Sequence, residues 1–334
     1  MELLQRLVLM AKEKTVRFYI HHKAKKEIKL LISDASVESP WESSATMSSL
    51  RLYMLTELWN RADMVDFCGT VLKERFEQSR DIGEISNAIS AYQRAVQLTP
   101  DGHADLPDRI NNLGNSFLCR FKCKGDLTDI ANARSCHQRA VQLTPSGHAD
   151  TPVRLNILGT SFVYLFECTG DPNDISSAIS VYQKGLQLAP DGYAEMPGHL
   201  NNLGNSLSLR CECTGDLTDV VDAISAHERA IQLTPDGHAD MPIWLNNLGS
   251  SFSQRFRLTG DLTDIENAIS AYKRAVQLTP NGHADMPSWL NNLGSCFSQR
   301  FQLTGDLTDI ANAISAHKRR SSSLPMAMLT CRVG

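Results

Sequence analysis

The sequence lacks the features that would point to a membrane, a nucleic acid or a disulfide framework. Its 334 residues carry a formal net charge of −4, without the basic excess typical of proteins that bind nucleic acids or anionic membranes. No apolar run approaches the roughly 20 residues of a membrane-spanning helix, and the N-terminus, with Glu2, is unlike a secretory signal. The nine cysteines include no CxxC pair, which favours reduced thiols and a cytoplasmic location.

Motifs of catalysis are also missing. The sequence contains no nucleophile elbow, phosphate-binding loop, dinucleotide fingerprint or zinc-binding helix motif. We therefore expect a protein that is not an enzyme and that has no cofactor and no metal site. We also expect no nucleic acid, membrane or small-molecule substrate among its partners.

What the sequence does contain is a repeat of 45 residues. The segment GDLTD recurs at Gly125, Gly215, Gly260 and Gly305, with the variant GDPND at Gly170. The same interval separates the members of two further series, which are Pro107, Pro152, Pro197, Pro242 and Pro287, and Gly114, Gly159, Gly204, Gly249 and Gly294. A period kept over five copies indicates one structural unit that is repeated.

Each copy is predicted to be a hairpin of two helices. At about 100° per residue, one apolar stripe of the first helix comprises Leu245, Leu248, Phe252 and Phe256. This helix is expected to begin near Pro242 and to end at the TGD segment. The second helix is expected to start at Thr263-Asp264, whose side chains can cap it, and to continue to Thr279-Pro280. Gly249 is expected where two helix backbones approach closely.

The positions within one hairpin resemble the signature of the tetratricopeptide repeat (TPR). They are Leu245, Leu248, Gly249 and Phe252, then Ala268, Tyr272, Ala275 and Pro280. The family's repeat has about 34 residues, so the first helices and the loops are longer here. The resemblance covers about residues 62 to 319 and implies an all-α fold, an α-solenoid in which TPR-like hairpins form a right-handed superhelix.

Some segments are similar to narrower groups within that family. LNNLG, GDLTD, AISAY and TPDGHAD are similar to the long-period arrays of fungal proteins, which are often followed by a caspase-like CHAT protease domain. The LNN segment is also similar to kinesin light chain repeats. No protease domain can fit after the last repeat, so its chemistry does not transfer to this sequence.

The sequence divides into four parts. Residues 1–61 are predicted to hold a basic helix and a Ser-rich linker, without an assigned function, and residues 62–106 a degenerate first hairpin. Residues 107–319 hold the regular repeats. In residues 320–334 the string RSSSLPMAMLTCRV replaces the expected AVQLTPDGHADMPS, and one nucleotide sequence read in two frames encodes both strings. We hypothesise that a frame change cut a longer array and left a disordered tail.

One polar row is the candidate binding site. It comprises Asn111, Asn156, Asn201, Asn246 and Asn291, and asparagine is a poor residue for a helix interior. Asn246 shares a polar flank with Ser250, Ser253 and Arg257, and the predicted groove also includes Asn115 and Asn205. In the TPR family the corresponding stripe lines a concave groove, where a carboxamide can donate to and accept from a peptide backbone. The alternative is that duplication copied a harmless surface residue.

Three other rows are predicted to be structural. The loop histidines His103, His148, His238 and His283 stand too far apart to share a metal ion, so we expect them to order their loops. The second-helix row Tyr92, His137, Tyr182, His227, Tyr272 and His317 suggests a packed, hydrogen-bonded core site, with a pH-sensitive interface as the alternative. Cys123, Cys168 and Cys213 share a position with Leu258 and Leu303, which suggests an apolar filler.

The function predicted from these patterns is a non-enzymatic scaffold for protein-protein interaction. It would bind an extended peptide or a partner protein in the concave groove. The alternative is a sensor or regulatory arm of a larger fungal TPR protein whose C-terminal effector domain, CHAT protease-like, is missing.

Overall fold

The computed structural model describes residues 61–280 and 282–323, and within these ranges the regular structure is entirely helical. The predicted basic helix and most of the linker, in residues 1–60, lie outside the described residues, as does the predicted tail from residue 324 onward. The described helices are α4 (Ala62–Ser79), α5 (Ile82–Leu98), α6 (Leu106–Lys124), α7 (Leu127–Leu143), α8 (Thr151–Thr169), α9 (Pro172–Leu188), α10 (Met196–Thr214), α11 (Leu217–Gln232), α12 (Met241–Thr259), α13 (Leu262–Leu278), α14 (Met286–Thr304) and α15 (Leu307–Ser323).

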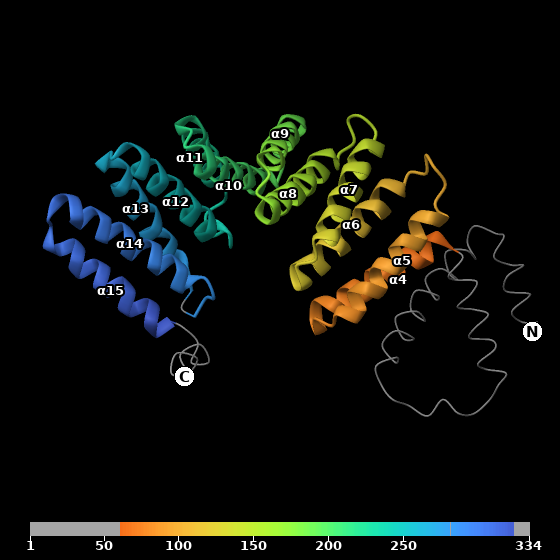
Figure 1. Ribbon diagram of the computed structural model, residues 1–334, viewed down its shortest axis with the longest axis horizontal. Helices are drawn as coiled ribbons and strands as arrows, with labels where there is room; N and C mark the ends of the chain where they lie inside the picture. Colours follow the sequence, from red (N-terminus) through yellow and green to blue (C-terminus); the bar gives the residue numbers. More distant parts are fainter. Residues whose placement is uncertain (1–60, 281, 324–334) are drawn as a thin grey trace, which may run out of the picture. The chain divides into compact units, whose positions relative to one another are not determined.

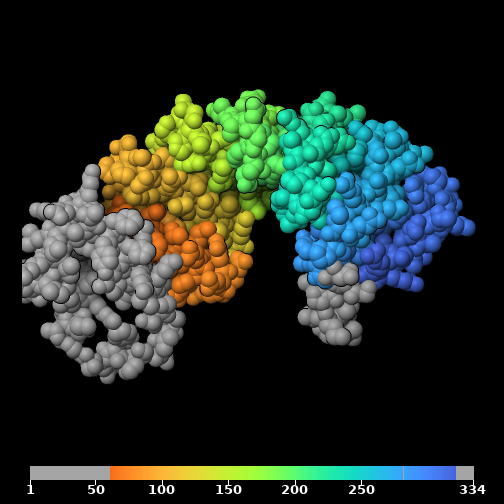
Figure 2. Space-filling view, turned by 180° about the vertical axis from the view of Figure 1, so that it is seen from behind, coloured from red at the N-terminus to blue at the C-terminus, as the bar shows by residue number. Residues whose placement is uncertain are grey.

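Consecutive helices pack as hairpins, beginning with α4 and α5 and ending with α14 and α15 (Figure 1). The chain separates into two compact units, with α4 to α7 in the unit that ends at Ser146 and α8 to α15 in the unit that begins at Gly147. Within each unit, the second helix of one hairpin packs against the first helix of the next, and the colours in Figure 2 follow this sequence order. Stacking of nearest neighbours defines an α-solenoid, so the predicted fold class is confirmed.

The helix boundaries come from local signals. Each regular first helix has a proline in its first turn, as at Pro242, and ends before a glycine such as Gly260, whose φ of 75° is left-handed and favours a residue without a Cβ. The second helix is capped by Asp261, the first of the two aspartates in GDLTD. Its Oδ1 accepts a hydrogen bond of 2.9 Å from the Thr263 amide. The prediction that Thr263 and Asp264 provide the cap was therefore wrong, because the cap is Asp261, two residues before Thr263.

Asp264 joins the two helices of its hairpin instead. Its carboxylate accepts two hydrogen bonds from the Arg255 guanidinium, at 2.9 and 2.5 Å, and its side chain is only 3% exposed. This neighbour raises the pKa of Arg255 through the hydrogen bond to the carboxylate. Four hairpins repeat the pair, which is Arg120–Asp129, Arg210–Asp219, Arg255–Asp264 and Arg300–Asp309. These pairs fasten the first helix to the second.

The glycine of LNNLG accommodates an aromatic ring and not a helix backbone. A Cβ added to Gly249 would lie 2.9 Å from the Tyr272 ring, and one added to Gly204 would lie 2.6 Å from the His227 ring. Both rings are buried. The sequence therefore correctly predicted a close approach at this position, but the close neighbour is the second-helix aromatic residue of the same hairpin.

We expect Gly204→Ala to destabilise the protein by about 1–3 kcal/mol, because the fully buried His227 ring must shift to admit a methyl group. Gly198→Ala is the matched control in the same helix, α10, since nothing lies within 4 Å of its added Cβ. There the gain in helix propensity should stabilise the protein by up to about 1 kcal/mol. Urea unfolding followed by circular dichroism would measure both. Equal stability of the two variants would contradict the packing argument.

Candidate functional site

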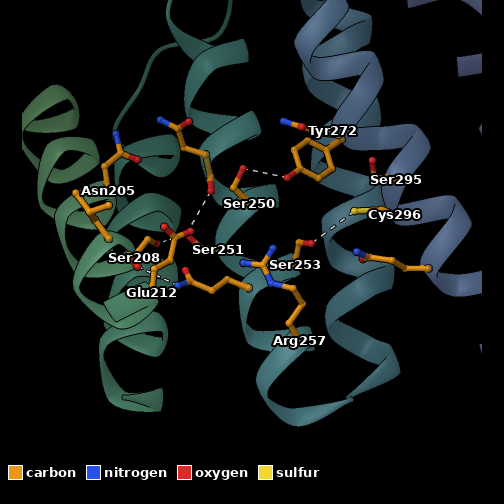
Figure 3. A pocket seen from close by; sticks show the side chains of 15 residues that line it. Asn205, Ser208, Glu212, Ser250, Ser251, Ser253, Arg257, Tyr272, Ser295 and Cys296 are labelled. Atoms are coloured by element: carbon orange, nitrogen blue, oxygen red, sulfur yellow. Dashed lines mark hydrogen bonds between the residues drawn. The ribbon is translucent and has the colours of Figure 1, made fainter. Parts of the chain in front are cut away.

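A polar pocket of about 480 Å³ lies in the unit that begins at Gly147 (Figure 3). It is formed by the first helices α10, α12 and α14, with one side chain from α13. Its lining consists of Asn205, Ser208, Leu209, Glu212, Asn247, Ser250, Ser251, Ser253, Gln254, Arg257, Tyr272, Asn292, Ser295, Cys296 and Gln299. Hydroxyl and carboxamide groups dominate this set, so the pocket offers donors and acceptors of hydrogen bonds more than apolar surface.

Part of the predicted groove lines this pocket. Asn205, Ser250, Ser253 and Arg257 belong to its wall. The asparagine row, in contrast, contributes none of its members. Two lining asparagines, Asn247 and Asn292, are the second ones of their LNN segments, and the third, Asn205, follows the glycine of LNNLG. Asn111 and Asn115 lie on α6, in the other unit.

The predicted asparagine row connects successive hairpins. The Nδ2 of Asn247 donates to Oδ1 of Asn201 at 2.9 Å. The two equivalent hydrogen bonds run from Asn202 to Asn156 and from Asn292 to Asn246, each at 3.1 Å. At α14, Asn291 Oδ1 accepts instead from Arg320 Nη1 at 2.9 Å. Four of the five side-chain oxygens in this row thus accept hydrogen bonds within the fold, whereas Asn111 Oδ1 is buried without a partner in the described residues.

Four carboxamides of the pocket were not predicted from the sequence, although helical periodicity marks them. The missed residues are Asn247 and Gln254 on α12 and Asn292 and Gln299 on α14, each pair seven residues apart. Two turns of a helix place such residues on one face. The i, i+3, i+7 pattern that joins Asn247 to Ser250 and Gln254 therefore marks the pocket wall.

Several lining groups are already bonded within the fold. The hydroxyls of Ser208 and Ser251 lie 2.9 Å apart, and Gln254 Nε2 donates to the carbonyl oxygen of Ser208 at 2.9 Å. Ser250 and the Tyr272 hydroxyl are also hydrogen-bonded, at 3.0 Å. These contacts, drawn as dashed lines in Figure 3, hold the pocket walls in place.

Five other lining side chains form no hydrogen bond or ion pair with the described part of the chain. They are Asn205, Glu212, Arg257, Ser295 and Gln299. Within this set, Gln299 Oε1 is shielded from solvent and still has no partner in the described residues. A shielded acceptor without a donor costs about 1–3 kcal/mol, which a bound donor would recover. The pocket therefore presents unused polar groups from three successive first helices.

The second-helix aromatic row is buried from Tyr92 to Tyr272, as predicted, but the predicted hydrogen bonding holds for the tyrosines and is wrong for His227. Where the residue is tyrosine, its hydroxyl meets a hydroxyl of the first helix, in the pairs Thr70–Tyr92, Thr160–Tyr182 and Ser250–Tyr272. Where it is His227, the ring is fully buried, and neither nitrogen has a partner among the described residues. Burial lowers the pKa of His227 to about 4.

The loop histidines order their loops, as predicted. His238 Nδ1 accepts a hydrogen bond of 3.2 Å from the Asp240 amide, and its ring stacks on Trp244. In the described ranges, no group of three or more His, Cys, Asp or Glu residues could hold a metal ion. The apolar-filler prediction for the cysteine row was wrong, because Cys123, Cys168 and Cys213 are exposed at the ends of their helices.

No helix in the described part of the chain has the length and apolar character needed to cross a membrane.

The thiol that lines the pocket is unreactive in its surroundings. Burial raises the pKa of Cys296 to about 11. A thiol with such a pKa is protonated at neutral pH and is a poor nucleophile.

Comparison with known proteins supports the fold. No protein-family model and no curated protein matches the chain. Among solved structures, the chain is similar to the C-terminal part of a TPR repeat-containing protein from Cytophaga hutchinsonii, with a TM-score of 0.55 and 13% identity over 83% of this chain and 93% of that one. The predicted resemblance to TPR arrays is therefore confirmed at the level of the fold.

A second similar structure contains nearly identical TPR-like repeats of a putative kinesin light chain from Podospora anserina. Its TM-score is 0.45 and its identity 9%, over 62% of this chain and 93% of that one.

Proposed function

We propose that this chain is a scaffold for protein-protein interaction and that the pocket of α10, α12 and α14 binds an extended peptide segment of a partner. The observation that carries the proposal is the set of five unused polar side chains, which lie on three successive first helices of one pocket. A peptide backbone alternates donors and acceptors, and the carboxamides of Asn205 and Gln299 can serve both. Other partner contacts must add to these bonds, since each neutral hydrogen bond contributes about 0.5–1.5 kcal/mol.

The predicted row that includes Asn201, Asn246 and Asn291 remains part of the proposal in a changed form. The side-chain oxygens of these three residues accept hydrogen bonds within the fold, and Asn246 Nδ2 also donates to Asn247 Oδ1 at 3.4 Å. The N–H groups that remain on Nδ2 could donate to a peptide carbonyl. Replacing Asn201 would disturb the stacking of hairpins together with any binding. The unused groups separate these two effects and are the better targets.

The proposal is tested by selecting peptides from a phage-displayed library of random twelve-residue sequences on the folded chain. We expect the double variant Asn205→Ala with Gln299→Ala to bind the selected peptides about tenfold more weakly, because two hydrogen bonds are lost. The matched control is Gln187→Ala with Gln277→Ala, two exposed glutamines on second helices outside the pocket. Titration calorimetry measures the affinity, and circular dichroism measures the thermal stability.

Two outcomes would contradict the proposal. One is a library that yields no binding peptide. The other is a set of peptides whose affinity falls equally in the pocket variant and in the control. Loss of affinity in the pocket variant alone, at unchanged thermal stability, would support it.

We also propose that the chain is not an enzyme and acts in the cytoplasm. The described residues that line the pocket include no histidine or lysine, and burial raises the pKa of their one thiol, Cys296, to about 11. The eight described cysteines are all free thiols, which supports a reducing compartment. The alternative function, a regulatory arm of a larger fungal protein, depends on the reading frame around Arg319 and stays a prediction.

A further inference from the structure

Two side chains of opposite charge line the pocket without a partner. Glu212 lies in the last turn of α10, and Arg257 occupies the same position in α12, one repeat later. Both are exposed, no ion pair joins them, and neither bonds to another described residue. Figure 3 shows both among the labelled side chains of the pocket. The fold itself therefore uses neither charge.

The neighbouring arginines, Arg210 and Arg255, do not neutralise Glu212 or add to the charge of Arg257, because both are already paired. Arg210 and Arg255 precede Glu212 and Arg257 by two residues, and each forms two hydrogen bonds to a buried aspartate of the second helix. Because these arginines are paired, Glu212 and Arg257 remain as the charged side chains among the described residues that line the pocket. The sign changes from negative to positive between α10 and α12.

The acidic part continues onto α8. Glu167 holds the same repeat position there, and it has no hydrogen-bond or ion-pair partner in the described residues. Desolvation raises the pKa of this carboxyl, and no cation acts against the shift. On α14 the position is occupied by the neutral Gln302. Along the unit that begins at Gly147, the row is therefore acidic, acidic, basic and neutral.

The spacing of the helices predicts how far apart the complementary charges of the partner should be. Packed helices lie about 10 Å apart. An extended peptide advances about 3.3 Å per residue, so it covers that distance in about three residues. Resting on the proposed function, we infer that the partner segment carries basic residues opposite Glu167 and Glu212 and an acidic residue opposite Arg257, each about three residues from the next.

The inference is tested by repeating the peptide selection on single charge reversals. The chain itself should select peptides with basic and acidic residues about three apart. Glu212→Arg leaves Arg257 beside a second positive charge, so it should select two acidic residues at that spacing. Arg257→Glu should select two or three basic residues. Glu266→Arg, which reverses an exposed charge on α13 outside the pocket, should select the same peptides as the unchanged chain.

Affinity gives a second measure. Neutralising either side chain, by Glu212→Gln or Arg257→Gln, should weaken the binding of a selected peptide about threefold, as expected for exposed charge pairs. Binding to the unchanged chain should also weaken between 50 and 500 mM NaCl, because salt screens such pairs.

The outcomes separate this inference from the proposed function. If peptides bind and respond to Asn205→Ala with Gln299→Ala, but all charge variants select the same sequences, the charge pattern is wrong and the peptide pocket stands. If no chain selects a peptide, the proposed function and this inference both fail. A selected charge pattern that follows each reversal supports the inference.

Discussion

Arg255→Ala should lower the free energy of unfolding by about 3 kcal/mol, the largest loss that we expect from any single polar side chain of the described helices. The substitution leaves the Asp264 carboxylate, only 3% exposed, without the guanidinium that now donates two hydrogen bonds to it. Removing one partner of a buried ion pair costs about 3–5 kcal/mol, and the 27% exposure of Arg255 places this case at the lower end.

A second substitution identifies the cause. If the loss comes from an uncompensated charge, then Arg255→Ala combined with Asp264→Asn should be more stable than Arg255→Ala alone, because an amide costs less to bury than a carboxylate. The control is Arg274→Ala, an exposed arginine of α13 without a partner in the described residues, which should change stability by less than about 0.5 kcal/mol. Urea unfolding measures the stability, and hydrogen exchange shows whether α12 and α13 open first. A double variant as unstable as the single one would contradict this explanation.

Acid should destabilise the protein through His227. Burial lowers the pKa of this side chain to about 4 in the folded chain, compared with about 6.5 for an unfolded histidine. Between these values the unfolded state binds more protons than the folded state. The stabilising contribution is therefore complete above about pH 6.5 and is lost as the pH falls towards 4, with a total loss of about 3 kcal/mol.

The tyrosine form of the hairpin supplies the test. His227→Tyr combined with Asn205→Ser reproduces the Tyr272 and Ser250 pair, which is hydrogen-bonded at 3.0 Å. We expect this variant to lose about a third of the acid sensitivity, because the pKa of two other buried histidines, His137 and His199, is also lowered to about 4 by burial. Thermal unfolding between pH 4 and 7 measures the difference. An unchanged pH profile would show that His227 does not control acid stability.

The hairpins could be predicted from the sequence because their signals are local. Each signal determines the structure within a few residues of itself: Pro242 starts the first helix, Gly260 ends it, and the apolar stripe of Leu245, Leu248 and Phe252 is its buried face. These signals recur every 45 residues, so each hairpin supports the prediction for the others. Helix boundaries such as Met241 and Leu278 consequently fell within about a residue of the prediction.

The residues of the site were harder to predict because they depend on stacking. Neighbouring asparagines such as Asn246 and Asn247 differ by about 100° around the helix. Which of them faces the pocket is decided by the next hairpin, whose position the sequence does not state. The predicted role of Asp264 as a cap was wrong for a related reason. Its place in GDLTD is equally compatible with capping the helix and with pairing to Arg255, nine residues away.

The hydrogen bonds between asparagines of successive hairpins are the same at each of three contacts between first helices. The donor in one hairpin and the acceptor in the hairpin before it are 46 residues apart in all three such bonds of the unit that begins at Gly147. If one whole copy were gained or lost, an asparagine donor would again face an asparagine acceptor where the flanking hairpins meet. The length of the array can thus change in evolution without loss of this contact.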